Sequence, residues 1–169
     1  MSPLIQLVFK KIMFFSKWFS KKVKRIAFLD GDNPLPQVLA CHKKYLIGIE
    51  THLIRCMGAE HKEPKILKNT KNINKIYLRG MTIGKEITDK FIGAYIQKAI
   101  QDGYTEITVV SQDYDFIDIF KMAVLLNPEA AKLSFRIIVP IMNKGSKLTD
   151  MPAQVANISV VRDVELIYT

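Results

Sequence analysis

The sequence predicts an α/β protein in which helices flank a mainly parallel sheet. Short runs of β-branched and aromatic residues alternate with longer segments whose apolar residues recur every three or four positions. Strands separated by helices of this length form βαβ units with right-handed crossovers, which give a parallel sheet covered on both faces. The chain has 169 residues, of which 49% are hydrophobic, so one domain can bury a core of its own.

The elements follow one another in a regular order. The apolar, β-branched run at residues 25–29 predicts a short buried strand, and Pro34 after Asn33 is typical of a cap and a first-turn proline that open a helix. Helical spacing that stops at Asp102 and Gly103 predicts a helix over 85–101. The remaining predicted strands are 51–57, 75–79, 106–110, 135–139 and 158–161, and the remaining helices are 115–126 and a short one that Ser146 caps and that runs to about Ala156.

The N-terminal segment differs from the rest in charge. Residues 1–25 account for +7 of the formal charge of +9, which leaves 18 basic against 16 acidic residues in the remainder. Apolar residues three or four positions apart predict a basic amphipathic helix over 1–23, before a domain over 24–169. These apolar residues are Leu4, Val8, Ile12, Phe15 and Phe19.

Three interpretations of residues 3–22 remain open. The helix can lie on an anionic membrane surface, it can bind a protein partner or nucleic acid, or it can pack on its own domain or on a neighbouring copy in a homo-oligomer. Lysines interrupt its apolar run far below the roughly 20 residues that a spanning helix needs.

Cys41 and Cys56 form no CxxC pair, which favours a reducing compartment. We therefore expect a cytoplasmic protein, with the membrane surface as an alternative place of attachment.

Two predicted strands end in the same acidic pattern. Asp30 and Asp32 follow the strand at 25–29, and Asp113 and Asp115 follow the strand at 106–110. The carboxyl ends of parallel strands lie along one edge of a sheet, so these side chains can converge. Aspartates are also favoured at helix starts for structural reasons, and that explanation stays open. If the four carboxylates do meet, divalent cations are needed to offset their repulsion, and oxygen ligands favour Mg²⁺ or Mn²⁺.

The motifs around these aspartates resemble those of a known protein family. Phe28-Leu29-Asp30-Gly31-Asp32-Asn33 resembles the opening hhDxxN motif of NYN domains, a branch of the PIN-like nuclease superfamily. The segment from Val110 to Phe116 resembles the S-G-D-x-D-F signature of these domains, with Gln112 in place of the usual glycine. The segment from Gly84 to Asp89 is similar to their Lys-rich turn, which leads into a helix with an early aspartate.

The resemblance implies a Rossmann-like (PIN-like) sheet and a ribonuclease that cleaves RNA phosphodiester bonds with Mg²⁺ or Mn²⁺. It implies that Asp30, Asp89 and Asp113 bind the metal, with Asp115 as a further ligand or a base. Asn33 and Ser111 support the site or the substrate around it. Lys85 is either a phosphate contact or a solvated lysine of the first helical turn.

A basic stretch over 61–79 gives a second indication of an RNA substrate. Basic residues recur every three or four positions there, and only Glu63 opposes them. Such a stripe can follow a phosphate backbone without reading bases, although a solvated surface has the same pattern. The stripe consists of Lys62, Lys65, Lys68, Lys71, Lys75 and Arg79, of which Lys65, Lys68 and Lys71 are the main candidates for RNA contacts.

Two other functions compete with the nuclease. The segment that starts at Asp30 also resembles the opening D-x-D motif of haloacid-dehalogenase-like phosphatases, with Asp30 as nucleophile and Asp32 as acid/base, although Pro34 departs from that pattern. Outside enzymology, the chain could be a catalytically inactive adaptor that binds RNA or a membrane. RNA cleavage that depends on Mn²⁺ distinguishes the nuclease from both.

Overall fold

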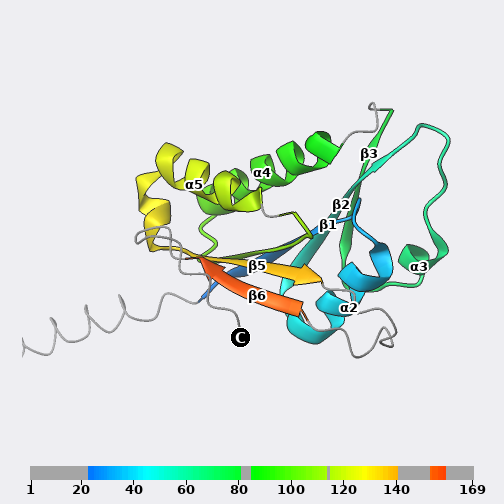
Figure 1. The fold of residues 1–169 in the computed structure, drawn as a ribbon, viewed down its shortest axis with the longest axis horizontal. Helices are drawn as coiled ribbons and strands as arrows, with labels where there is room; N and C mark the ends of the chain where they lie inside the picture. Colours follow the sequence, from blue (N-terminus) through cyan, green and yellow to red (C-terminus); the bar gives the residue numbers. More distant parts are fainter. Residues whose placement is uncertain (1–22, 81–84, 114, 141–152, 159–169) are drawn as a thin grey trace, which may run out of the picture.

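One six-stranded sheet organises the protein, and helices lie on both of its faces (Figure 1). The computed structural model describes residues 23–80, 85–113, 115–140 and 153–158. None of the helices in these ranges is long and apolar enough to cross a membrane. The elements are β1 (Arg25–Asp30), α2 (Leu35–Tyr45), β2 (Glu50–Met57), α3 (Lys65–Lys68), β3 (Asn74–Arg79), α4 (Lys85–Gln101), β4 (Glu106–Val110), α5 (Phe116–Leu126), the 3-10 helix η1 (Pro128–Lys132), β5 (Ser134–Pro140) and β6 (Ala153–Ile158).

The strand order is β3-β2-β1-β4-β5-β6, and the first five strands are parallel. This is a Rossmann-like fold, as the alternation of strands and helices predicts. The chain builds outward from β1 to β3 on one side and then returns to place β4 on the other side of β1. Leu29 of β1 therefore pairs with Val110 of β4, so the loops that follow these two strands start side by side.

Two hydrophobic cores lie on opposite faces of the sheet, because successive residues of a strand point to opposite faces. Phe28 belongs to the core under α4 and α5, where the rings of Phe120 and Phe135 lie 4.6 Å apart. Leu29 belongs to the other core, under α2, to which α3 contributes the buried Leu67. Figure 1 shows α4 and α5 on one side of the sheet and α2 and α3 on the other.

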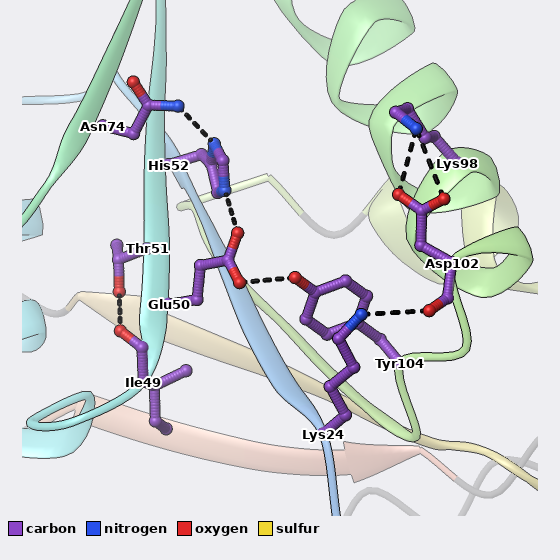
Figure 2. A network of polar contacts seen from close by, with 9 residues as sticks. All are labelled: Lys24, Ile49, Glu50, Thr51, His52, Asn74, Lys98, Asp102 and Tyr104. Atoms are coloured by element: carbon purple, nitrogen blue, oxygen red, sulfur yellow. Dashed lines mark hydrogen bonds and ion pairs between the residues drawn. The ribbon is translucent and has the colours of Figure 1, made fainter.

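A polar network joins the amino ends of four neighbouring strands (Figure 2). The Tyr104 hydroxyl donates a hydrogen bond to Glu50, and Glu50 lies 3.0 Å from Nε2 of His52. Asn74 continues the network to β3 through Nδ1 of His52, and the Lys24 ammonium lies 3.9 Å from the centre of the Tyr104 ring. Burial and the Glu50 carboxylate raise the pKa of Tyr104 to about 12, so the phenol stays a donor at neutral pH. This network connects the amino ends of the strands, and the aspartates lie at the opposite, carboxyl ends.

The C-terminal part of the described chain corrects one prediction. The sequence predicts a helix up to about Ala156, but Ala153–Ile158 form strand β6, which pairs antiparallel with β5. Strand β6 covers the edge of β5, whose backbone groups need partners, and this tertiary requirement outweighs the local helical pattern. The predicted strand 158–161 therefore starts earlier, and residues 159–161 lie outside the described ranges, as do Ser146 and residues 1–22 of the predicted N-terminal helix.

Candidate active site

An acidic cleft of about 510 Å³ opens where the loops after β1 and β4 meet the first turns of α4. Among the residues whose side chains the structure describes, no basic one lines it. The parallel pairing of β1 with β4 brings the two Asp-x-Asp segments to this cleft, and Asp89 reaches it from α4. The acidic cleft is lined by Asp30, Asp32, Asn33, Pro34, Asp89, Gln112, Asp113 and Asp115.

Asp30 forms the floor of the acidic cleft and is only 4% exposed. Its Oδ1 accepts a hydrogen bond from the backbone N–H of Asp32 at 3.1 Å. Its Oδ2 accepts one from the Ser111 hydroxyl at 2.9 Å and another from the side-chain amide of Asn33. Burial nevertheless raises the pKa of Asp30, although the Ser111 and Asp32 hydrogen bonds favour the charged form. The hydrogen bonds thus fix the orientation of the Asp30 carboxylate, and burial makes its charged form less stable than in water.

Asn33 and Ser111 hold the two loops together, and Asn33 also lines the acidic cleft. The Asn33 side chain donates to Oγ of Ser111 at 3.2 Å, and its Oδ1 accepts from the backbone N–H of Gln112 at 3.3 Å. Helix α2 starts with Pro34 as its cap and without a side-chain cap bond, so Asn33 does not cap the helix as the sequence predicts. Ser111 is completely buried and accepts from the backbone N–H of Asp113 at 3.1 Å. Both side chains therefore act by positioning Asp30 and the Asp113 loop.

Asp32 is held by groups that the sequence alone does not bring near it. Its Oδ1 accepts from the backbone N–H of Cys56 at 3.1 Å, and its Oδ2 accepts from the hydroxyl of Thr88 at 2.5 Å. Thr88 is completely buried at the start of α4, so this bond ties the β1 loop to the residue before Asp89. The Asp-x-Asp spacing was the signal for Asp32, whereas no sequence signal indicates Thr88.

Asp89 and Asp115 complete the acidic lining from two different helices. Asp115 occupies the N-cap position of α5 without a side-chain cap bond, and its backbone N–H donates to Oδ1 of Asp113 at 3.0 Å. Burial raises the pKa of Asp89 to about 6, and the next largest contribution is the charge of Asp30, followed by the charges of Asp113, Asp115 and Asp32. Because the carboxylates repel one another, a cation in the cleft is favoured by their combined field.

The donor set fits a hard divalent cation in its chemistry. The acidic groups of the cleft offer carboxylate oxygens, which Mg²⁺ and Mn²⁺ prefer, and its described lining contains neither histidine nor cysteine. Within the described residues, however, no three His, Cys, Asp or Glu side chains are already gathered closely enough to hold an ion. Mg²⁺ commonly binds through one or two carboxylates and keeps several waters, so a fully formed protein cage is not required.

Three of the basic residues predicted to contact RNA, Lys65, Lys68 and Lys71, do not line the acidic cleft. Lys65, Lys68 and Lys71 are exposed, and Lys71 lines a different cavity. Two members of the predicted stripe are used within the fold, since Lys75 lies 3.3 Å from Glu63 and Arg79 donates to the carbonyl oxygen of His61 at 3.2 Å. Only α3 is helical in this stretch, and the side chain of Lys85 lies outside the described part of the chain.

The raised pKa of Asp89 predicts how the metal-free protein responds to pH. A carboxyl whose pKa is higher in the folded than in the unfolded chain binds more protons when folded, so stability falls as pH rises from about 4 to about 6. We expect Asp89→Asn to remove this loss. In EDTA, the difference in melting temperature between the variant and the wild type should therefore be larger at pH 7 than at pH 5, with the variant more stable. His42, whose pKa is lowered by burial, gives a slope of opposite sign in both proteins and cancels in the difference. An equal difference at both pH values would contradict the prediction.

The chain matches no model of a known protein family, and no curated protein is significantly similar to it.

Proposed function

We propose that this protein is a metal-dependent ribonuclease that hydrolyses RNA phosphodiester bonds in the acidic cleft. The observation that carries the proposal is the convergence of five aspartates from three separate parts of the chain on one cleft. Three of them, Asp30, Asp89 and Asp113, are the positions that the NYN-like motifs assign to the metal. Their meeting depends on β1 and β4 being neighbours, which the motifs alone do not require.

The residues of the cleft have separate roles in this proposal. Asp30, Asp89 and Asp113 bind Mg²⁺ or Mn²⁺, and the exposed Asp115 is either a further ligand or the base that accepts a proton from water. The bound ion would supply the positive charge that polarises the phosphate and offsets the charge of the transition state. Ser111 and Asn33 keep Asp30 oriented, a kind of support whose loss typically costs about 10–100-fold in metal affinity or activity. Asp32 braces the loop against Cys56 and Thr88.

The same contacts make a phosphatase with an Asp30 nucleophile a poorer explanation. Asp32, the expected acid/base, has both oxygens bound to Cys56 and Thr88. An inactive RNA-binding adaptor, by contrast, differs from the nuclease only in activity and is distinguished by experiment.

Cleavage of a labelled single-stranded RNA by the full chain tests the proposal. We expect no cleavage in EDTA, cleavage that rises with added Mn²⁺ or Mg²⁺, and a melting temperature that rises over the same range, because the ion binds the native state. A simple aryl phosphate serves as the control substrate and should not be turned over.

Three results would contradict the proposal in different ways. RNA binding without cleavage at any metal concentration indicates the adaptor. Turnover of the aryl phosphate that depends on Asp30 indicates the phosphatase. No change in melting temperature with either metal excludes a metal site in the acidic cleft. A variant with Lys65, Lys68 and Lys71 changed to Gln tests the predicted RNA contacts, and an unchanged salt dependence of RNA binding would return these lysines to the solvated surface.

A further inference from the structure

A second cavity, of about 940 Å³, lies near the amino ends of the strands, whereas the acidic cleft lies at their carboxyl ends. It is formed by Pro36 and residues 39–49, which include most of α2 and the turn before β2, and by Ile66 and residues 69–72 around the end of α3. This turn immediately precedes the amino end of β2, whereas Asp30 ends the neighbouring parallel strand β1. We call this cavity the basic groove. It and the acidic cleft therefore lie at the two ends of the same strands.

The basic groove combines exposed aliphatic side chains with lysines. Ile47 is 80% exposed and Ile66 is 40% exposed, although both are large apolar residues. Lys43, Lys44 and Lys71 line the groove beside them and are exposed, and none of the described residues that line it is acidic. An aliphatic group left in water costs free energy that burial would recover, so this combination indicates a surface that is covered by an anionic, apolar partner.

The chain enters strand β1 at the same ends of the strands as the basic groove. Ile26 of β1 pairs with Glu50 of β2 in parallel register, so the residues before β1 and the turn that contains Ile47 lie at the same ends of the strands. Val23, at the start of the described chain, is 51% exposed. Residues 1–22 contain five lysines, five aromatic residues and no acidic residue. Because these residues are positively charged, a groove lined by lysines repels them. The N-terminal residues and the groove would instead both attract an anionic partner.

We propose that the basic groove docks on an anionic phospholipid surface, with the acidic cleft facing away from it. Lysines near such a surface are attracted to its negative potential, and aliphatic side chains enter the boundary between headgroups and acyl chains. Phosphates of RNA could also attract the lysines, but they give no reason for an isoleucine that is 80% exposed. An anionic surface repels the acidic cleft at the other end of the strands, so charge favours this orientation.

Sedimentation of the full chain with vesicles tests this proposal. We expect binding to vesicles of phosphatidylcholine mixed with phosphatidylserine and little binding to phosphatidylcholine alone. Changing Lys43, Lys44 and Lys71 to Gln should weaken binding by about fivefold for each lysine removed, which corresponds to about 1 kcal/mol per charge. Ile47→Ser should weaken it further at high salt, where charge is screened and apolar insertion dominates.

A matched variant separates this surface from general charge attraction. Changing Lys98, Lys121 and Lys132 to Gln removes the same charge from α4, α5 and η1, on the other face of the sheet, and should leave vesicle binding within about twofold of the wild type if the groove sets the orientation. Equal losses in both triple variants, or no loss in the groove variant, overturn the proposal. Vesicle binding that is unchanged while RNA binding falls assigns the groove to RNA instead. Melting curves of all variants confirm that the exposed substitutions leave the fold intact.

Discussion

Replacing Asp113 with asparagine is expected to lower metal-dependent RNA cleavage by at least about a hundredfold. The charge stabilisation that a bound cation gives a phosphoryl transition state is worth several kcal/mol, and each 1.36 kcal/mol is a factor of ten in rate. Asparagine keeps the shape and the Oδ1 atom that accepts the backbone N–H of Asp115 at 3.0 Å, so the loop is preserved. The measurement is the initial rate of labelled RNA cleavage as a function of Mn²⁺ concentration.

The same variant should behave differently in melting experiments. In EDTA its melting temperature should be no lower than that of the wild type, because one of several mutually repelling carboxylates is gone. Added metal should then raise its melting temperature less than it raises that of the wild type. Asp118→Asn is a matched control, since Asp118 is exposed on α5, lies 3.2 Å from Lys121 and does not line the acidic cleft. Full cleavage by Asp113→Asn would show that the acidic cleft is not the metal site.

Gly31→Ala is expected to destabilise the fold by about 1–3 kcal/mol, the range typical of overpacking. A Cβ atom at Gly31 would lie 2.7 Å from the carbonyl oxygen of Ile54 and 2.7 Å from Cβ of Arg55, closer than real contacts allow. The backbone cannot simply move away, because the N–H of Gly31 donates to Ile54 at 2.7 Å and its carbonyl accepts from the Arg55 guanidinium. Since Gly31 lies between Asp30 and Asp32, cleavage should fall as well.

Gly93→Ala provides the contrast for this prediction. Gly93 lies inside α4, where an added Cβ would only reach ordinary contact with Ile119 at 3.4 Å. Alanine is favoured over glycine in a helix by up to about 1 kcal/mol, so this variant should be neutral or more stable. Chemical denaturation of the three proteins measures both effects. A Gly31→Ala variant as stable as the wild type would show that the β1 loop has more room than the structure gives it.

Elements with strong local patterns were predictable from the sequence. Helix α4 and strand β4 have the predicted bounds, because the spacing of their apolar residues and the Asp102-Gly103 stop are properties of neighbouring residues. The aspartates after two strands were also visible, since strand ends and their polar followers are local features. The error at Ala153–Ile158 has the opposite cause, because β6 depends on pairing with β5 and not on its own residues.

The details of the site depended on contacts between distant residues. Nothing near Asp32 in the sequence indicates that Cys56 and Thr88 bind its two oxygens. The basic stripe shows the reverse case. Its spacing suggested one surface, but Lys75 and Arg79 are used by Glu63 and by the carbonyl oxygen of His61, which the chain brings near them only on folding.

The sequence by itself determined the class of the fold and which carboxylates follow strands β1 and β4, because periodicity and turn residues act over a few positions. Only the tertiary structure decided that these carboxylates share one cleft with Asp89. That outcome requires β4 to return beside β1, and the strand order results from packing two helical layers on the sheet. The same step placed Ile47 and Lys71, from separate segments, in one groove at the other end of the strands. Side-chain convergence of this kind is a property of long-range packing, which no short stretch of sequence encodes.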